Sequence, residues 1–203
     1  CGIGNVQEPI AKIQLHVARA VGCRPNEVDV RLVAQHAFEY YVLNATRFDD
    51  LPPYLLKVTV DGRDVTDVAE TILRDPFPFP YDLHFNRVTA SAGIEALRAL
   101  ASDTPVKTHL PGVGRELGGY PVTASANGIE IELPPEWTLD QARAVNQRSL
   151  SWDGIEDVTA DGTIVFSDNT KRALHDFAGA APETLTVKNA EQQAASLLAQ
   201  ILT

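Results

Sequence analysis

The sequence contains no methionine, not even at its first position, and only two cysteines, Cys1 and Cys23. Two cysteines are too few to build a disulfide-rich secreted scaffold. No apolar run approaches the roughly 20 residues that a membrane-spanning helix needs, and no signal peptide begins the chain. We therefore expect a cytoplasmic protein that does not contact a membrane. The missing start residue predicts a processed chain or a part of a longer protein.

Positive charge is also scarce. Lys and Arg number 17 against 27 Asp and Glu, which gives a net charge of -10. A surface this acidic repels phosphate backbones, so we expect no nucleic-acid partner. The five histidines show no metal-ligand spacing such as H-x-x-x-H, and we expect no metal site.

Apolar periodicity predicts the secondary structure. A helix begins after Asn5 and ends at Gly22, because Ile10, Ile13 and Val17 recur on one face. Further helices are predicted over 64–73, 87–102, 138–150, 169–177 and 188–202. Strands are predicted over 28–34, 38–43 and 55–60, and 104–119 is predicted to be a loop with room for a short strand near Val106.

Two hairpin signals decide the fold class. Asn127-Gly128 separates two strand-like stretches, 120–125 and 129–133, and Asp161-Gly162 lies in the middle of 158–166. Such dipeptides favour tight turns between antiparallel strands. Helices and strands do not alternate regularly. The sequence therefore predicts an α+β fold with a mixed, largely antiparallel sheet and flanking helices.

The order of motifs near the start resembles a known family. Residues 2–8 (GIGNVQE) open a helix, residues 23–28 (CRPNEV) form a turn, and a strand leads to residues 34–36 (AQH). This order is similar to the start of the C-terminal domain of lactate and malate dehydrogenases. There G-x-G-T-x-L-D opens the helix and the strand ends at a catalytic histidine. Family-4 glycosidases have a similar frame, with G-L-C-N-x-P before the helix and N-H after the strand.

A second stretch carries the same resemblance. Residues 117–130 (LGGYPVTASANGIE) are similar to the dehydrogenase stretch l-g-x-P-v-x-x-g-x-n-G-v-e, which also precedes a long helix. The resemblance implies a fold like the lactate dehydrogenase C-terminal domain, with the substrate-side catalytic domain over residues 1–152. Residues 153–203 are expected to form a hairpin and helical extension packed on it. The N-terminal nucleotide-binding domain of these families is not present in the chain.

The resemblance implies the substrate-binding and catalytic part of an NAD(P)-dependent oxidoreductase, or of an NAD-dependent family-4-type glycosidase. NAD or NADP would be supplied by the missing N-terminal domain, and we expect none to bind this chain alone. The chain's own glycine cluster, around Gly112 and Gly114, precedes a strand rather than a helix. Expected partners are a small-molecule substrate, the nucleotide-binding domain and further copies in a homo-oligomer. An apolar face for such partners is expected near residues 1–10 and around the hairpin at Tyr120.

His36 falls where the resemblance places the catalytic histidine, and an imidazole suits proton transfer to or from a hydroxyl group. Glu8 falls where the dehydrogenases carry the carboxylate that orients this histidine. We therefore expect His36 and Glu8 to be catalytic and to face a shared cleft. The alternatives are a half-buried structural histidine, and a Glu8 that stabilises only its own helix N-terminus.

Two further residues are expected to bind substrate. Asn5 lies at the junction before the first helix, and Lys12 is the cation nearest to Ala11, the position of the dehydrogenases' substrate-binding arginine. Asn5 could instead cap the helix, and Lys12 could be a solvated surface lysine.

Two other functions remain open. The chain could be a dimerisation or regulatory module that kept the fold without the chemistry. It could also use Cys1 as an N-terminal nucleophile, since amidotransferases of that kind begin Cys-Gly-Ile, although they continue as strands rather than as a helix.

Overall fold

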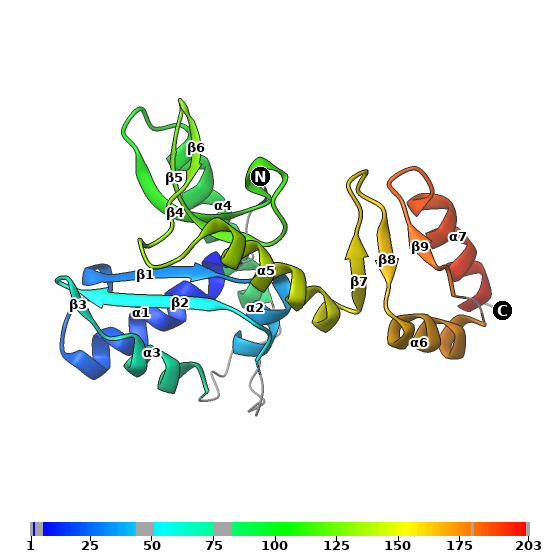
Figure 1. Ribbon diagram of the computed structural model, residues 1–203, viewed down its shortest axis with the longest axis horizontal. Helices are drawn as coiled ribbons and strands as arrows, with labels where there is room; N and C mark the ends of the chain where they lie inside the picture. Colours follow the sequence, from blue (N-terminus) through cyan, green and yellow to red (C-terminus); the bar gives the residue numbers. More distant parts are fainter. Residues whose placement is uncertain (1, 3–5, 44–50, 75–82, 180, 202–203) are drawn as a thin grey trace. The chain divides into compact units, whose positions relative to one another are not determined.

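The computed structural model describes residues 2, 6–43, 51–74, 83–179 and 181–201. These residues form seven α-helices and three small antiparallel sheets of three strands each (Figure 1). The α+β class is therefore confirmed, but the expectation of one mixed sheet is wrong. The chain divides into two compact units, Cys1–Ser149 and Leu150–Thr203. None of the described helices is both long and apolar enough to cross a membrane.

The first sheet of the Cys1–Ser149 unit has the order β1 (Val28–Val33), β2 (Leu55–Val60), β3 (Arg63–Asp64). β1 pairs with β2 so that Val30 lies opposite Val58. Alternate β1 residues such as Val28 and Leu32 enter a core shared with α1 (Gln7–Val21) and α3 (Thr66–Leu73). The short helix η1 (Pro25–Glu27) connects α1 to β1.

The second sheet consists of β4 (Val106–Pro111), β5 (Gly119–Ser125) and β6 (Gly128–Ile131), and it packs with α4 (Leu83–Leu100) and α5 (Leu139–Ser149) around a second core. The turn η2 (Val113–Arg115) lies between β4 and β5. A backbone bridge between Ala34 and Gly119 joins the end of β1 to the start of β5. The predicted hairpin turning at Asn127-Gly128 is confirmed.

One sequence-based assignment in this unit is wrong, and another is incomplete. Residues 36–43 form a helix, α2 (His36–Leu43), rather than a strand. Phe38 and Val42 are both buried and lie one helical turn apart, so tertiary packing overrides the β-propensity of this aromatic segment. The short strand expected near Val106 is present as β4, but it continues to Pro111 through residues that were predicted to be loop. Its buried residues include Thr108 and His109, which hide the apolar pattern of a strand.

Two residues of the expected apolar face for partners are buried, whereas Ile10, Ile129 and Ile131 in the same regions are half-buried. Val6 is 1% exposed and Tyr120 is 0% exposed. Val6 packs so closely against Gly119 that a Cβ added to this glycine would lie 2.3 Å from a Val6 methyl group. Val6 and Tyr120 are therefore part of the interior and are not available to bind a partner.

The Leu150–Thr203 unit begins with η3 (Leu150–Asp153) and has a sheet of β7 (Ile155–Val158), β8 (Ile164–Phe166) and β9 (Thr184–Leu185). Two helices complete it, α6 (Asp168–Ala178) and α7 (Ala190–Ile201). The β7–β8 hairpin confirms the prediction from Asp161-Gly162. The residues of β7 and β8 are mostly half-buried. The Leu150–Thr203 unit therefore has only a small hydrophobic core.

Candidate functional site

The first turn of α1 is unusually polar for a buried segment. Gln7, Glu8 and Lys12 are all buried, and the Gln7 amide donates to Thr108 Oγ1 on β4 at 3.1 Å. Val6, the residue before the helix, offers no side-chain cap. Glu8 is 3% exposed, and its neighbour is another acidic side chain rather than solvent.

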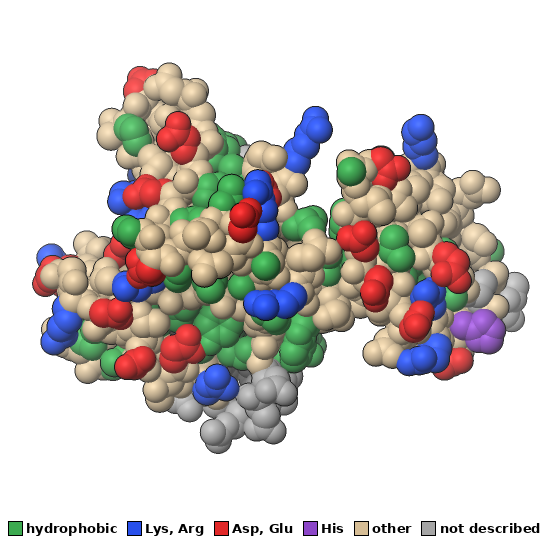
Figure 2. All heavy atoms as spheres, in the orientation of Figure 1, with side chains coloured by type: hydrophobic (Ala, Val, Ile, Leu, Met, Phe, Trp, Pro, Cys, Tyr) green, Lys and Arg blue, Asp and Glu red, His purple; other side chains and the backbone are tan. Residues whose placement is uncertain are grey.

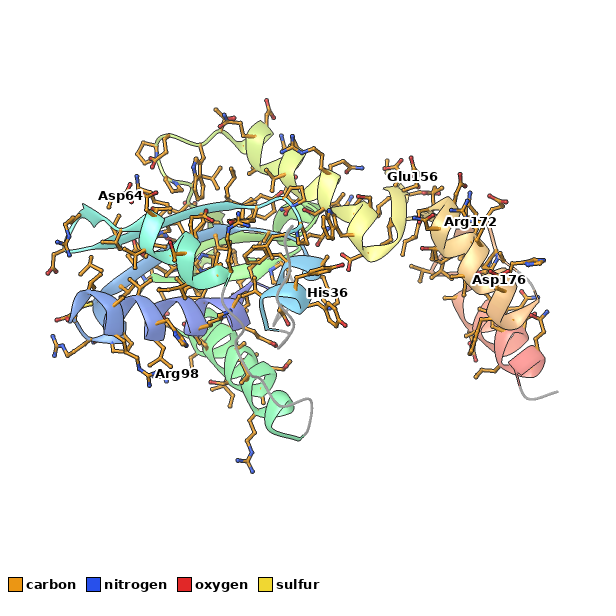
Figure 3. The ribbon with its side chains drawn as sticks, turned by 90° about the horizontal axis from the view of Figure 1, so that it is seen from below. His36, Asp64, Arg98, Glu156, Arg172 and Asp176 are labelled. Carbon is orange, nitrogen blue, oxygen red and sulfur yellow. The ribbon has the colours of Figure 1, made fainter. Side chains whose placement is uncertain are left out.

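That neighbour is Glu39, on α2. The helix begins at His36, whose backbone N–H donates to Gln35 Oε1 at 3.3 Å. One turn later Glu39 points inward and is 7% exposed, whereas the His36 side chain is exposed. Figure 3 places His36 at the start of α2, next to solvent. The short helix thus presents an imidazole outside and a carboxyl group inside.

Glu8 and Glu39 form a proton-sharing pair. Burial raises the pKa of Glu39 well above its ordinary value of 4.5, and the hydrogen bond and the negative charge of Glu8 raise it further. Two carboxylates have no proton to donate, so a hydrogen bond between them requires that one group stay protonated. Oε2 of each carboxyl group is buried and has no hydrogen-bond partner among the described residues. We therefore assign one proton to the pair at neutral pH.

Lys12 supplies the balancing charge. It is 3% exposed, and its Nζ donates to the carbonyl oxygen of Val42, near the end of α2, at 3.0 Å. Glu8 and Lys12 are four residues apart and so lie on the same face of α1. A buried ammonium group is tolerated when a negative charge accompanies it. One proton on the pair leaves one negative charge, so the pair and Lys12 together are neutral.

The structure brings three of these residues together in one buried cluster between α1 and α2. We call Glu8, Lys12 and Glu39 the α1–α2 cluster. Glu8 and Lys12 were identified from the sequence, and Lys12 is buried rather than a solvated surface residue. His36 lies three residues before Glu39 on α2, at a helix start and not at a strand end. Asn5 and Cys1 lie outside the described residues.

Glu39 was missed from the sequence. In a strand, successive side chains point to opposite faces of the sheet. Read in this way, Glu39 would lie on the face opposite to that of its neighbours Phe38 and Tyr40. Read as part of a helix, Glu39 lies three residues before the buried Val42 and so near the buried side of the helix, whereas His36 is exposed. The signal that could have identified it was the spacing of Phe38 and Val42, which fits a helix as well as a strand.

The described residues do not offer a dinucleotide cradle. Gly112 and Gly114 have positive φ angles of 68° and 62°, and the Gly112 N–H donates to Gly118 O at 3.0 Å. These glycines therefore form a turn from one strand to the next, whereas pyrophosphate binding needs a glycine turn that opens a helix. Within the same residues, no group of three or more His, Cys, Asp or Glu could hold a metal ion.

On the face shown in Figure 2, acidic and basic side chains of the Cys1–Ser149 unit are interspersed, without a broad patch of positive charge. Neither a protein-family model nor a curated protein matches the sequence of this chain.

Proposed function

We propose that the Cys1–Ser149 unit is the substrate-side catalytic domain of an NAD(P)-dependent oxidoreductase that acts on a small hydroxy compound. One observation carries the proposal: Glu8 on α1 and Glu39 on α2 are two neighbouring buried carboxyl groups, and Glu39 follows the exposed His36 by three residues. A like-charged buried pair is costly, and such pairs are concentrated at sites of proton transfer.

In this proposal His36 exchanges a proton with the substrate hydroxyl group, because histidine is the side chain whose ordinary pKa lies nearest to neutral pH. The negative charge on the Glu8–Glu39 pair favours the imidazolium form that results. Lys12 holds the end of α2 in place and balances the pair. The described residues do not fit a dinucleotide, so the nicotinamide would belong to another domain, and we assign it no step here. The proposal also includes a homo-oligomeric assembly with that domain.

The test uses the full-length protein that carries this chain. NAD(P)-linked oxidation of lactate and malate, and hydrolysis of nitrophenyl glycosides in the presence of NAD, are measured for the native protein. His36→Gln should lower turnover by roughly 10²-fold if the imidazole is the base. His175→Gln is the matched control, because His175 is an exposed residue of α6 in the other unit and should have full activity.

Each outcome distinguishes a different function. Activity on glycosides but not on hydroxy acids would favour the family-4-type glycosidase. An oxidation rate that is unchanged in the His36→Gln variant would refute the role of His36 as the base. No activity of either kind would favour a dimerisation or regulatory module. The chain alone should show no micromolar binding in calorimetric titrations with NAD or NADP, and such binding would contradict the assignment of the cofactor to another domain.

A further inference from the structure

A separate pocket of about 150 Å³ opens between α1, β1, α4 and β4. None of Glu8, His36 and Glu39 lines it, so it is distinct from the α1–α2 cluster. Its walls combine an arginine, a histidine and two acidic residues, which are Arg31, His109, Asp29 and Glu95. We call it the Arg31 pocket.

Arg31 is the positive group of this pocket. It lies on β1, on the strand face opposite the first core, and its side chain is 10% exposed. Its Nε donates to Asp29 Oδ2 at 3.2 Å. Within the described part of the chain, neither Nη group has a hydrogen-bond acceptor. A nearly buried guanidinium needs such acceptors, and its two Nη groups match the two oxygens of a carboxylate.

His109 supplies a second donor. It is 6% exposed on β4, and its Nε2 accepts the backbone N–H of Leu32 at 3.2 Å. Burial, and then the positive charge of Arg31, lower its pKa to about 3. The ring is therefore neutral and carries its proton on Nδ1. Among the residues described, this Nδ1–H has no acceptor.

The acidic side chains limit which ligand can enter. Glu95, on α4, is exposed and has no ion-pair partner among the described residues. Asp29 is engaged by Arg31 through only one of its two oxygens. Lys107 also lines the pocket, but it is paired with Glu132 at 2.7 Å. An anion alone would meet unbalanced negative charge, whereas a ligand with an ammonium group would offset it.

We propose that the Arg31 pocket binds an α-amino acid, with Arg31 and His109 donating to its carboxylate and Glu95 and Asp29 accepting from its ammonium group. The volume fits a compact ligand, since a cavity of about 150 Å³ holds a molecule the size of benzene, with about six heavy atoms. Alanine has that size. The proposal does not depend on the oxidoreductase function.

The experiment follows backbone amide signals of the ¹⁵N-labelled chain by NMR. Three probes of nearly equal size are titrated: L-alanine, L-lactate, which lacks the ammonium group, and L-alaninamide, which lacks the carboxylate. Alanine should shift the amide signals of Leu32, Thr108 and His109. The two analogues should bind at least about tenfold more weakly, equivalent to a loss of 1.4 kcal/mol or more. Inorganic phosphate, as a dianion, should not shift these signals.

Arg31→Gln should weaken alanine binding at least about tenfold, since it removes the main charged donor. The control is Arg98→Gln, which removes a positive charge from α4 at a residue that does not line this pocket (Figure 3). If Arg31→Gln unfolds the chain, Glu95→Gln is used to test the proposal instead, because Glu95 is exposed and its replacement should not affect folding. Glu95→Gln should weaken alanine binding severalfold but strengthen lactate binding, since it removes negative charge that the lactate anion meets.

Three results would overturn the proposal. The first is the absence of any shift of the Leu32, Thr108 and His109 amide signals at an alanine concentration of about 10 mM. Such a result would mean that the dissociation constant for alanine lies well above this concentration. The second is binding of lactate or alaninamide as tight as that of alanine. The third is undiminished alanine binding by a folded Arg31→Gln variant.

Discussion

Glu39→Gln should stabilise the protein at neutral pH, although it replaces a buried residue. The folded chain keeps the Glu39 proton because the pKa of Glu39 is raised by burial and by Glu8. The unfolded chain loses that proton above pH 4.5. Between pH 4.5 and 7 the unfolded state therefore binds fewer protons, and stability falls by about 1.4 kcal/mol per pH unit. The total is roughly 3 kcal/mol at pH 7.

A glutamine at this position is neutral at every pH, and its amide can donate to Glu8 as the protonated acid does. The gain from Glu39→Gln should therefore be small near pH 4.5 and grow to roughly 3 kcal/mol at pH 7. Urea unfolding measures it, with Trp137 fluorescence as the reporter of the Cys1–Ser149 unit. Trp152 belongs to the other unit and is replaced by phenylalanine in all variants.

The matched control is Glu130→Gln. Glu130 is an exposed residue of β6, so its replacement should change stability by less than about 0.5 kcal/mol at any pH. A Glu39→Gln variant whose advantage over the native chain does not grow between pH 4.5 and 7 would refute the shared proton. Equal pH dependence of the two proteins would mean that Glu39 is ionised in the folded state.

Three other changes test the packing. Lys12→Met should cost roughly 3 kcal/mol at pH 7, because it leaves the negative charge of the α1–α2 cluster unbalanced, and urea unfolding with an unchanged midpoint would contradict this. Gly119→Ala should lower the free energy of unfolding by more than about 2 kcal/mol, since the added Cβ would overlap Val6. In the control Gly62→Ala the added Cβ meets no atom within 4 Å, so the loss should be only the roughly 1 kcal/mol caused by the positive φ angle. Similar decreases in Tm for the two variants would disprove the overlap. His109→Gln should remove about 2 kcal/mol of acid destabilisation at pH 5, because a pKa lowered from 6.5 to about 3 makes stability fall as the pH drops below 6.5, and urea midpoints at pH 5 and 7.5 measure the difference.

The sequence predicted the elements whose apolar residues follow one clear period. β2 was located at its observed bounds, and both hairpins followed from Asn127-Gly128 and Asp161-Gly162. α2 was misassigned because Tyr40, Tyr41 and Val42 have high β-propensity, and only packing against the core selects the helix. Only the start of β4, near Val106, was predicted, because the polar side chain of His109 faces the interior.

Two of the three residues of the α1–α2 cluster were identified from the sequence. Glu8 and Lys12 were singled out because the resemblance to the dehydrogenases implied an orienting carboxylate at Glu8 and a substrate-binding cation next to Lys12. Glu39 could not be identified, since its role depends on which side of α2 faces α1. Neither could Arg31, because a charged residue in a strand normally points to solvent. Its burial results from a second sheet packed against the outer face of β1.

The connections that close the Cys1–Ser149 unit join residues that are far apart along the chain. Gln7 bonds to Thr108 across 101 residues, Leu32 to His109 across 77, and Ser149 to the Pro53 carbonyl across 96. The second sheet and α5 must therefore be synthesised before β1 can acquire its final environment. During translation, a ribosome that has produced only α1 to α3 exposes the unpaired face of β1, with Asp29 and Arg31 on it. The charges of Asp29 and Arg31 disfavour pairing of β1 with strands of other nascent chains. They therefore protect the incompletely synthesised protein from aggregation until its second sheet has been synthesised.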